Sequence, residues 1–268
     1  MIANARMYSV APRAAAAWRA LLEWAVHRAG VDCAVIDFPA PRPLPDLWSR
    51  PDLACAFMCG FPLSRTAPPP QIVAAPVPSP ARYGGRPVYW TDLVVRVDAA
   101  IGGVEAMLGR RMAYTTAESQ SGYQAVRRLF APHAARAGAP LFGAIIGPLI
   151  TPRAVVEAIA RGDADVGPVD SYALELLRRH APELTAQIRV VASTPPTPIP
   201  PLVASPHIEA DAVARLAAAL LAVENEAELA AVRRDLVLQR FERVDPAVYR
   251  TLAADATIAD ELGYPALV

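Results

Sequence analysis

The chain has 268 residues, of which 54% are hydrophobic, and its acidic and basic residues balance at 26 each. This length fits one large domain or two lobes of ordinary size, with enough apolar residues for a sizeable core. The balanced charge gives no bulk attraction to nucleic acid or to an anionic membrane. All 26 basic residues are arginine, which excludes chemistry that needs a lysine Schiff base or a P-loop lysine.

The first third of the chain predicts a β-α-β opening. The segment 6–10 reads as a short strand. Apolar residues then recur at helical spacing over 14–28, and Gly30 follows as a helix-ending residue. A second strand is expected at 33–38, and a strand-helix-strand order of this kind predicts a parallel sheet.

The same alternation continues along the middle of the chain, and the end is helical. Strands are predicted at 53–58, 72–76, 88–97, 111–115, 164–169 and 188–193, with an extended segment at 140–146. Helices are predicted at 121–130, 152–161, 171–180, 212–223, 227–241 and 246–253. Thr151 is a good cap for the second of these helices, and Gly162 ends it.

Motifs for metal, cofactor or covalent chemistry are missing from the sequence. The three cysteines do not form a disulfide or zinc pattern, and no HExxH, G-x-S-x-G, G-x-G-x-x-G or P-loop motif is present. We therefore expect no catalytic residue, no metal and no cofactor. Residues 1–30 lack the pattern of a secretory signal, and no run of 18 uncharged apolar residues predicts a membrane span.

The segment Glu118-Ser119-Gln120-Ser121-Gly122-Tyr123 opens a predicted helix. Hydroxyls and free backbone N–H groups at a helix start form an anion-binding cradle, and glycine permits close approach of a ligand. The alternative is a plain serine N-cap without a ligand, which is common.

Three further segments offer candidate ligand contacts, and each has a structural alternative. Cys59 and Gly60 follow a strand, where they either line a pocket or make a tight turn. Tyr89, Trp90 and Thr91 either line a cleft or pack in the core. Asp170 opens a helix, and its carboxylate is able both to cap that helix and to pair with a ligand amine.

The order of these motifs resembles the phosphate/phosphite/phosphonate-binding proteins of ABC importers, the PhnD-like family of type II periplasmic binding proteins. The resemblance covers residues 50–250. It rests on Cys59-Gly60-Phe61-Pro62, Tyr89-Trp90-Thr91-Asp92, Ser119-Gln120-Ser121-Gly122-Tyr123, Gly162-Asp163-Ala164-Asp165-Val166-Gly167, Asp170-Ser171-Tyr172 and Thr194-Pro195.

The resemblance implies an α/β fold of two lobes, each a mainly parallel sheet flanked by helices, joined by two hinge strands near Val94 and Val191. Lobe I is expected to hold residues 1–93 and 192–268, and lobe II residues 94–191. Ser119, Ser121, Gly122 and Tyr123 are expected to hold an oxyanion. By the same resemblance Tyr89, Trp90 and Thr91 line the hinge side, Asp170 faces the ligand, and Tyr8 reaches toward it.

The resulting prediction is a binding protein for a small oxyanion or zwitterion that works with an ABC permease. The family implies a periplasmic location, whereas the absence of a recognisable signal in these residues keeps a cytoplasmic one open. The alternatives are a cytoplasmic enzyme on the same fold, with Asp170 or Cys59 as first catalytic candidates, and a ligand sensor that acts on a partner protein.

Overall fold

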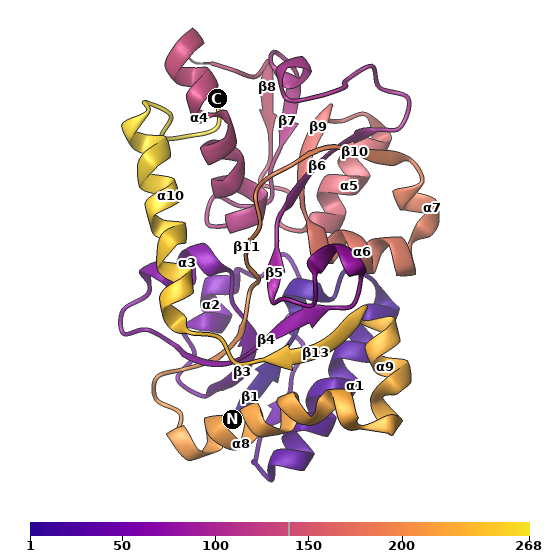
Figure 1. Cartoon of the computed structure of the whole chain (residues 1–268), viewed down its shortest axis with the longest axis vertical. Helices are drawn as coiled ribbons and strands as arrows, with labels where there is room; N and C mark the ends of the chain where they lie inside the picture. The colour runs from indigo at the N-terminus through magenta and orange to yellow at the C-terminus, as the bar shows by residue number, and fades with distance from the viewer. Residues whose placement is uncertain (139) are drawn as a thin grey trace. The chain divides into compact units, whose positions relative to one another are not determined.

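The computed structural model describes residues 1–138 and 140–268, and the chain divides into two compact units (Figure 1). Unit 1 contains Met1–Val88 and Pro198–Tyr249, and unit 2 contains Tyr89–Thr197 and Arg250–Val268. Each unit has a mixed β-sheet flanked by helices. The expected α/β class is therefore confirmed.

Unit 1 is built on a six-stranded sheet in the order β13-β4-β12-β3-β1-β2. Its strands are β1 (Ile2–Asn4), β2 (Ala34–Val35), β3 (Leu53–Phe57), β4 (Gln71–Pro78), β12 (Leu202–Ala204) and β13 (Leu238–Glu242). Strand β1 is parallel to β2 and β3, whereas β12 and β13 run antiparallel to their neighbours. Its helices are α1 (Pro12–Ala29), α2 (Leu44–Trp48), α3 (Gly60–Arg65), α8 (Ala210–Ala222) and α9 (Ala230–Asp235).

The core of unit 1 contains an aromatic cluster at the start of the chain. Phe57 lies edge-on to both Tyr8 and Trp18, with ring centroids 4.9 Å apart in each pair. Trp18 comes from the apolar stripe of α1, and Gly30 ends that helix in the left-handed conformation, with φ +59°. The helix predicted from periodicity is thus confirmed, because both its buried face and its ending residue are local features of the sequence.

Unit 2 is built on a five-stranded sheet in the order β10-β6-β9-β7-β8. Its strands are β6 (Thr91–Arg96), β7 (Arg111–Ala113), β8 (Ala144–Ile146), β9 (Val166–Asp170) and β10 (Ile188–Ser193). Strands β7, β8 and β9 are mutually parallel, and β6 runs antiparallel between β9 and β10. A separate two-stranded sheet pairs β5 (Val88–Tyr89) with β11 (Thr197–Pro198).

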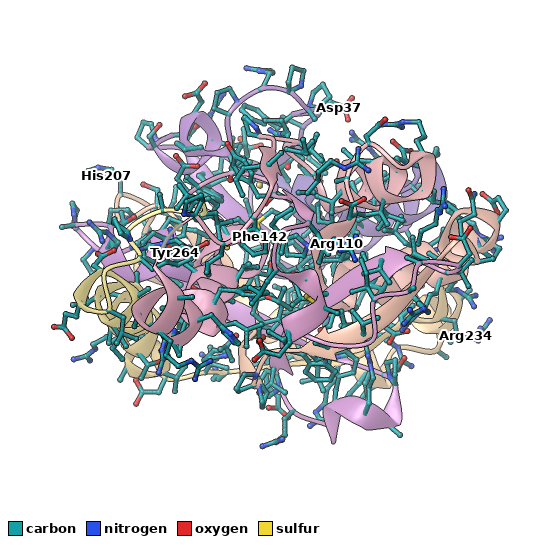
Figure 2. All side chains as sticks on the ribbon, turned by 90° about the horizontal axis from the view of Figure 1, so that it is seen from above. Asp37, Arg110, Phe142, His207, Arg234 and Tyr264 are labelled. Atoms are coloured by element: carbon teal, nitrogen blue, oxygen red, sulfur yellow. The ribbon has the colours of Figure 1, made fainter. Side chains whose placement is uncertain are left out.

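Helices cover both faces of the unit 2 sheet. They are α4 (Ala125–Ala137), α5 (Pro152–Arg161), α6 (Ser171–His180), α7 (Pro182–Thr185) and α10 (Arg250–Glu261). Figure 1 shows α4 and α10 side by side, and the two helices pack together. Buried residues of β6 and α4 form one core with residues of the C-terminal segment. Phe142 and Tyr264, both labelled in Figure 2, belong to this core. On α5's side, a Cβ at Gly167 would meet Val155 at 2.4 Å, so helix and strand pack closely.

Two predicted elements are wrong. The first strand lies at Ile2–Asn4 and not at 6–10, because the Asn4 side chain accepts a 2.8 Å hydrogen bond from the Arg6 N–H and turns the chain. The helix predicted over 227–241 ends at Asp235. Val237 then adopts φ +49°, and the following residues pair with β4 as strand β13.

The boundaries of the units differ from the predicted lobes. The chain passes between units at Val88/Tyr89 and Thr197/Pro198, so β6 and β10 lie wholly in unit 2. A third passage occurs at Tyr249/Arg250, because α10 packs on α4 and contributes Ala259 to the unit 2 core. Sequence reasoning had assigned all of 192–268 to the first lobe. Across the described parts of the chain, no helix has the length and apolar character needed to cross a membrane.

Candidate functional site

The candidate site lies at one edge of the unit 2 sheet. Because β7, β8 and β9 are parallel, their carboxyl ends meet at this edge, which we call the carboxyl edge. Strand β6 runs the other way and begins there, so Thr91 is the direct cross-strand partner of Asp170. Ligands of open α/β sheets bind beyond the carboxyl ends of the strands.

Three helices begin at the carboxyl edge, and each has a polar cap. Ser119 Oγ accepts the Gly122 N–H at 2.9 Å before a π-helical turn, Gln120–Gln124, that leads into α4. Thr151 Oγ1 accepts the Ala154 N–H at 3.1 Å at the start of α5. Asp170 Oδ1 caps α6. Helix starts carry partial positive charge, so together they favour an anion at this edge.

The turn after Ser119 offers hydrogen-bond donors to a ligand. Ser121 is 7% exposed, and within the described chain neither its backbone N–H nor its hydroxyl has a hydrogen-bond partner. The Ser119 hydroxyl accepts from Gly122 and keeps its own proton for another acceptor. Single-turn π-helical segments within helices are frequent at functional sites. The predicted anion-binding segment thus has its donors at the carboxyl edge.

Thr91 positions this turn. Its buried hydroxyl donates to the backbone carbonyl of Ser121 at 2.9 Å, and this bond ties the turn to the first residue of β6. Its backbone N–H in turn donates to Thr194 Oγ1 at 3.0 Å. The hydroxyl proton of Thr91 is therefore used within the protein, whereas the Ser121 hydroxyl and N–H keep their protons for another acceptor.

Gly122 is required by a neighbouring side chain. A Cβ added at this position would lie 1.9 Å from Thr115 Oγ1 and 2.9 Å from Ser119 Oγ. Thr115 is buried, and its hydroxyl has no hydrogen-bond partner among the described residues. Thr115 therefore fills the space beside the Gly122 Cα. This contact, and not the approach of a ligand, is the direct reason why position 122 excludes a side chain.

The C-terminal segment holds the start of α4 in place. Buried Arg127 donates to Gln124 Oε1 at 2.7 Å and to the Tyr264 carbonyl, and it pairs with Asp260. The Gln124 side chain then donates to the Ala117 carbonyl at 2.6 Å. A buried guanidinium needs hydrogen-bond partners, and those of Arg127 connect α10 and the segment after it to the π-helical turn at Gln120–Gln124.

Tyr123 is held from two sides. Its hydroxyl accepts the Leu267 N–H at 3.2 Å. Its ring stands edge-on to Tyr114 with centroids 5.3 Å apart, and burial together with Tyr123 raises the pKa of Tyr114. The Tyr114 phenol therefore stays protonated at neutral pH and presents a donor or an apolar edge, not negative charge, to an anion.

Trp90 is oriented by a buried carboxylate. Its indole N–H donates to Asp92 Oδ1 at 2.9 Å, and Ser193 Oγ donates to the same oxygen at 2.6 Å. The backbone of Trp90 also bonds Ser171, at the start of α6. Trp90 is half-buried at the carboxyl edge, whereas Tyr89 is 1% exposed and packs inside.

Asp170 accepts hydrogen bonds from the Tyr172 and Ala173 N–H groups at 2.8 and 2.9 Å. Both bonds go to Oδ1, so this carboxylate performs the capping role that the sequence indicated. Its position at the end of β9 is also next to the site, so the ligand-facing role stays a prediction.

Three predicted contacts belong to unit 1. Tyr8 packs in the aromatic core, Cys59 precedes α3 as a buried thiol, and Gly60 is the first residue of α3. They follow the carboxyl ends of the parallel strands β1 and β3. Their part in ligand binding stays a prediction.

Sequence reasoning missed several residues of the site. Thr115, Gln124 and Arg127 belong to no recognisable sequence motif. Tyr264 contributes through its carbonyl, which accepts a hydrogen bond from Arg127, 137 residues earlier in the chain. Ile150 was missed as well. Its φ of +70° is strained for a β-branched residue, and its N–H bonds the Thr115 carbonyl at 3.0 Å. Backbone strain of this kind is found at functional sites in many proteins. The residue types around Ile150 do not predict a positive φ there.

A family model for the periplasmic substrate-binding proteins of phosphonate ABC transporters matches residues 62–249. The chain belongs to this family. Membership agrees with the resemblance stated from the sequence motifs. A search of curated proteins found no match.

Three solved structures have a fold similar to that of this chain. A binding protein component of an ABC phosphonate transporter from Pseudomonas aeruginosa has a TM-score of 0.82 and 19% identity, covering 98% of this chain and 87% of that one. PhnD1 from Prochlorococcus marinus in complex with methylphosphonate has a TM-score of 0.74 and 14% identity, with 97% and 98% coverage. A histidine kinase sensor domain also shares the fold, with a TM-score of 0.57, 15% identity, and 90% and 97% coverage.

Proposed function

We propose that this phosphonate-family protein binds a small oxyanion of the phosphonate or phosphate class at the carboxyl edge of unit 2, as the binding component of an ABC importer. The observation that carries the proposal is the turn after Ser119. There the N–H and hydroxyl of Ser121 lack partners in the described chain, at an edge where three helices begin.

The anion is held by neutral donors. Hydrogen bonds to a charged group contribute about 1.5–3 kcal/mol each, and a helix start adds roughly 0.3–1 kcal/mol. Ser119 and Ser121 supply the hydroxyl protons, and the Ser121 N–H supplies a backbone donor. Neutral donors permit release, because no fixed cation has to be separated from the departing anion.

Asp170 directs the choice of ligand. A carboxylate beside the site repels a simple dianion and attracts an amine, so it favours a zwitterion such as an aminoalkylphosphonate. Trp90, whose indole N–H is bonded to Asp92, offers its ring to the apolar part of the ligand. Tyr8, Cys59 and Gly60 of unit 1 are further proposed contacts.

A thermal-shift screen tests the proposal. Methylphosphonate, 2-aminoethylphosphonate, phosphate and phosphite are each added to the full chain, with sodium chloride of equal ionic strength as reference. A ligand at 100 times its Kd stabilises the binding-competent fold by about 2.7 kcal/mol, so at least one of the four must raise the melting temperature. No shift with any of them, over a concentration range up to 10 mM, contradicts an oxyanion ligand.

The importer role needs a permease partner. It predicts that the ligand-loaded protein stimulates ATP hydrolysis by its cognate permease complex in liposomes, and that the unloaded protein stimulates less. Equal ATPase rates with and without the protein would leave ligand binding intact and overturn the transport role.

A further inference from the structure

A hollow lies in unit 2, away from the carboxyl edge. It is a cavity of about 310 Å³, which we call the arginine cavity. Its lining comes from the loop after β6, the start of β7, the end of α5 and the segment before β9, and its charged members are Arg96, Arg110, Arg111 and Asp165. The lining contains three guanidinium groups and one carboxylate, and the three guanidinium groups differ in their hydrogen bonds.

Arg111 is committed to the fold. Its guanidinium makes a two-pronged pair with Asp165, with Nη2–Oδ1 at 2.7 Å and Nε–Oδ2 at 3.1 Å. It also donates to the carbonyls of Gly162 and Asp163, just beyond the end of α5. This pairing lowers the pKa of Asp165, so the carboxylate is charged at neutral pH and is fully occupied by Arg111.

Arg110 and Arg96 retain free donors. Arg110 reaches only the Ala106 carbonyl, at 3.5 Å through Nε, and has no carboxylate partner within the described residues. Arg96 bonds Asp98 through Nε at 2.6 Å, and its two Nη groups have no acceptor in the same part of the chain. Figure 2 labels Arg110, whose carbonyl accepts the Gly143 N–H at 3.0 Å. Its backbone is therefore anchored to the neighbouring segment.

The rest of the lining is apolar. Ile101, Ile159 and Ala164 are buried, and Ala99 and Ala100 form the outer wall. A guanidinium fork matches the two oxygens of a carboxylate, and an apolar wall beside it matches a hydrocarbon body better than a hydrated inorganic ion. We propose that the arginine cavity is a second anion site, which binds the carboxylate of a small organic acid through Arg110 and Arg96.

This site is separate from the carboxyl edge. Arg111 begins β7, Asp165 precedes β9 and Arg96 ends β6, whereas Thr91 and Asp170 lie at the opposite ends of β6 and β9. Strand β9 has five residues, so the two sites are about 15 Å apart along the sheet. The second site does not depend on the proposed function.

Titration with 4-fluorobenzoate, followed by ¹⁹F NMR on the full chain, tests the proposal. Saturable broadening is expected for the acid and none for neutral 4-fluorobenzamide. Arg110→Gln should weaken the apparent affinity at least tenfold. Arg136→Gln is the matched control, since Arg136 is an exposed guanidinium whose hydrogen bond goes to His133 outside the cavity; it should change the affinity less than twofold.

Ala100→Trp fills the cavity from its exposed wall while leaving all three arginines, and it should abolish binding. Equal losses in Arg110→Gln and Arg136→Gln, full binding in Ala100→Trp, or equal broadening by the amide would each overturn the proposal. Displacement of the probe by methylphosphonate together with an unchanged Arg110→Gln affinity would place the probe at the carboxyl edge, and would overturn it too. Methylphosphonate binding itself should be the same in wild type and Arg110→Gln.

Discussion

The hydroxyl of Thr91 donates a 2.9 Å hydrogen bond to the backbone carbonyl of Ser121, across 30 residues of sequence. Both residues are buried, and a hydrogen bond is stronger in such surroundings than in water. It joins the first residue of β6 to the turn that carries the proposed anion donors. The position of those donors therefore depends on a residue whose own hydroxyl proton does not reach the ligand.

Thr91→Val should uncouple the turn from the sheet. The buried Ser121 carbonyl then loses its donor, which costs about 1–3 kcal/mol in urea unfolding, and ligand affinity falls because the turn is no longer fixed. Thr91→Ser keeps the hydroxyl and should restore both. An unchanged affinity in Thr91→Val, measured by calorimetry with whichever oxyanion binds wild type, would show that the bond does not position the site.

Gly122→Ala should destabilise the protein by about 1–3 kcal/mol, because overpacking of this size forces neighbours to move. The new methyl group would sit 1.9 Å from Thr115 Oγ1. Thr115→Ala removes that atom, so the double variant should lose less stability than the sum of the two single variants. Strict additivity in urea unfolding would mean that Thr115 is not what excludes a side chain at position 122.

Asp170→Asn separates the two ligand classes. Asparagine caps a helix as well as aspartate does, so the start of α6 should remain intact and the melting temperature should change little. If Asp170 pairs with a ligand amine, the affinity for 2-aminoethylphosphonate falls about tenfold or more, while that for methylphosphonate holds or rises. Parallel losses for both ligands would argue against a charge-based role.

The pair between Arg111 and Asp165 predicts a pH-dependent stability. Hydrogen bonding to Arg111 lowers the pKa of Asp165, so the charged form stabilises the fold above the ordinary pKa of about 3.9. That contribution is lost as the pH falls through the lower pKa of the folded state. Asp165→Asn should therefore melt earlier than wild type at pH 7, and the gap should narrow toward pH 3.

Asp163→Asn is the control for this pair, because Asp163 and its partner Arg161 are both more than half exposed. Pairs of that kind contribute little, so its melting temperature should follow wild type across the same range. A gap between Asp165→Asn and wild type that stays constant from pH 7 to pH 3 would show that ionisation of Asp165 plays no part.

Local features of the sequence predicted much of the fold. Thr151 with Pro152 at one end and Gly162 at the other delimit α5 within the chain itself, and the structure has this helix at Pro152–Arg161. Strand β13 was misread as helix, because its pairing with β4 joins segments more than 150 residues apart. Such pairing is decided by tertiary packing and leaves little trace in local periodicity.

The candidate site shows the same division. Its donor segment was found because serines and a glycine at a helix start have a local meaning, and Asp170 was found as a cap for the same reason. The residues that hold the segment were not found. Arg127 meets Tyr264 only because α10 packs on α4. Thr115 is linked to Gly122 only by packing, because its hydroxyl occupies the space that a Cβ at position 122 would need.

Isothermal titration of methylphosphonate into wild type and Ser121→Ala tests the central claim most directly. Wild type should bind saturably, and the variant should bind about 10- to 100-fold more weakly, since it lacks one hydrogen bond to a charged oxygen. Ser49→Ala, which alters an exposed serine of unit 1, should match wild type. Binding by wild type with an identical Kd in Ser121→Ala would contradict the account, because the anion would then be held elsewhere.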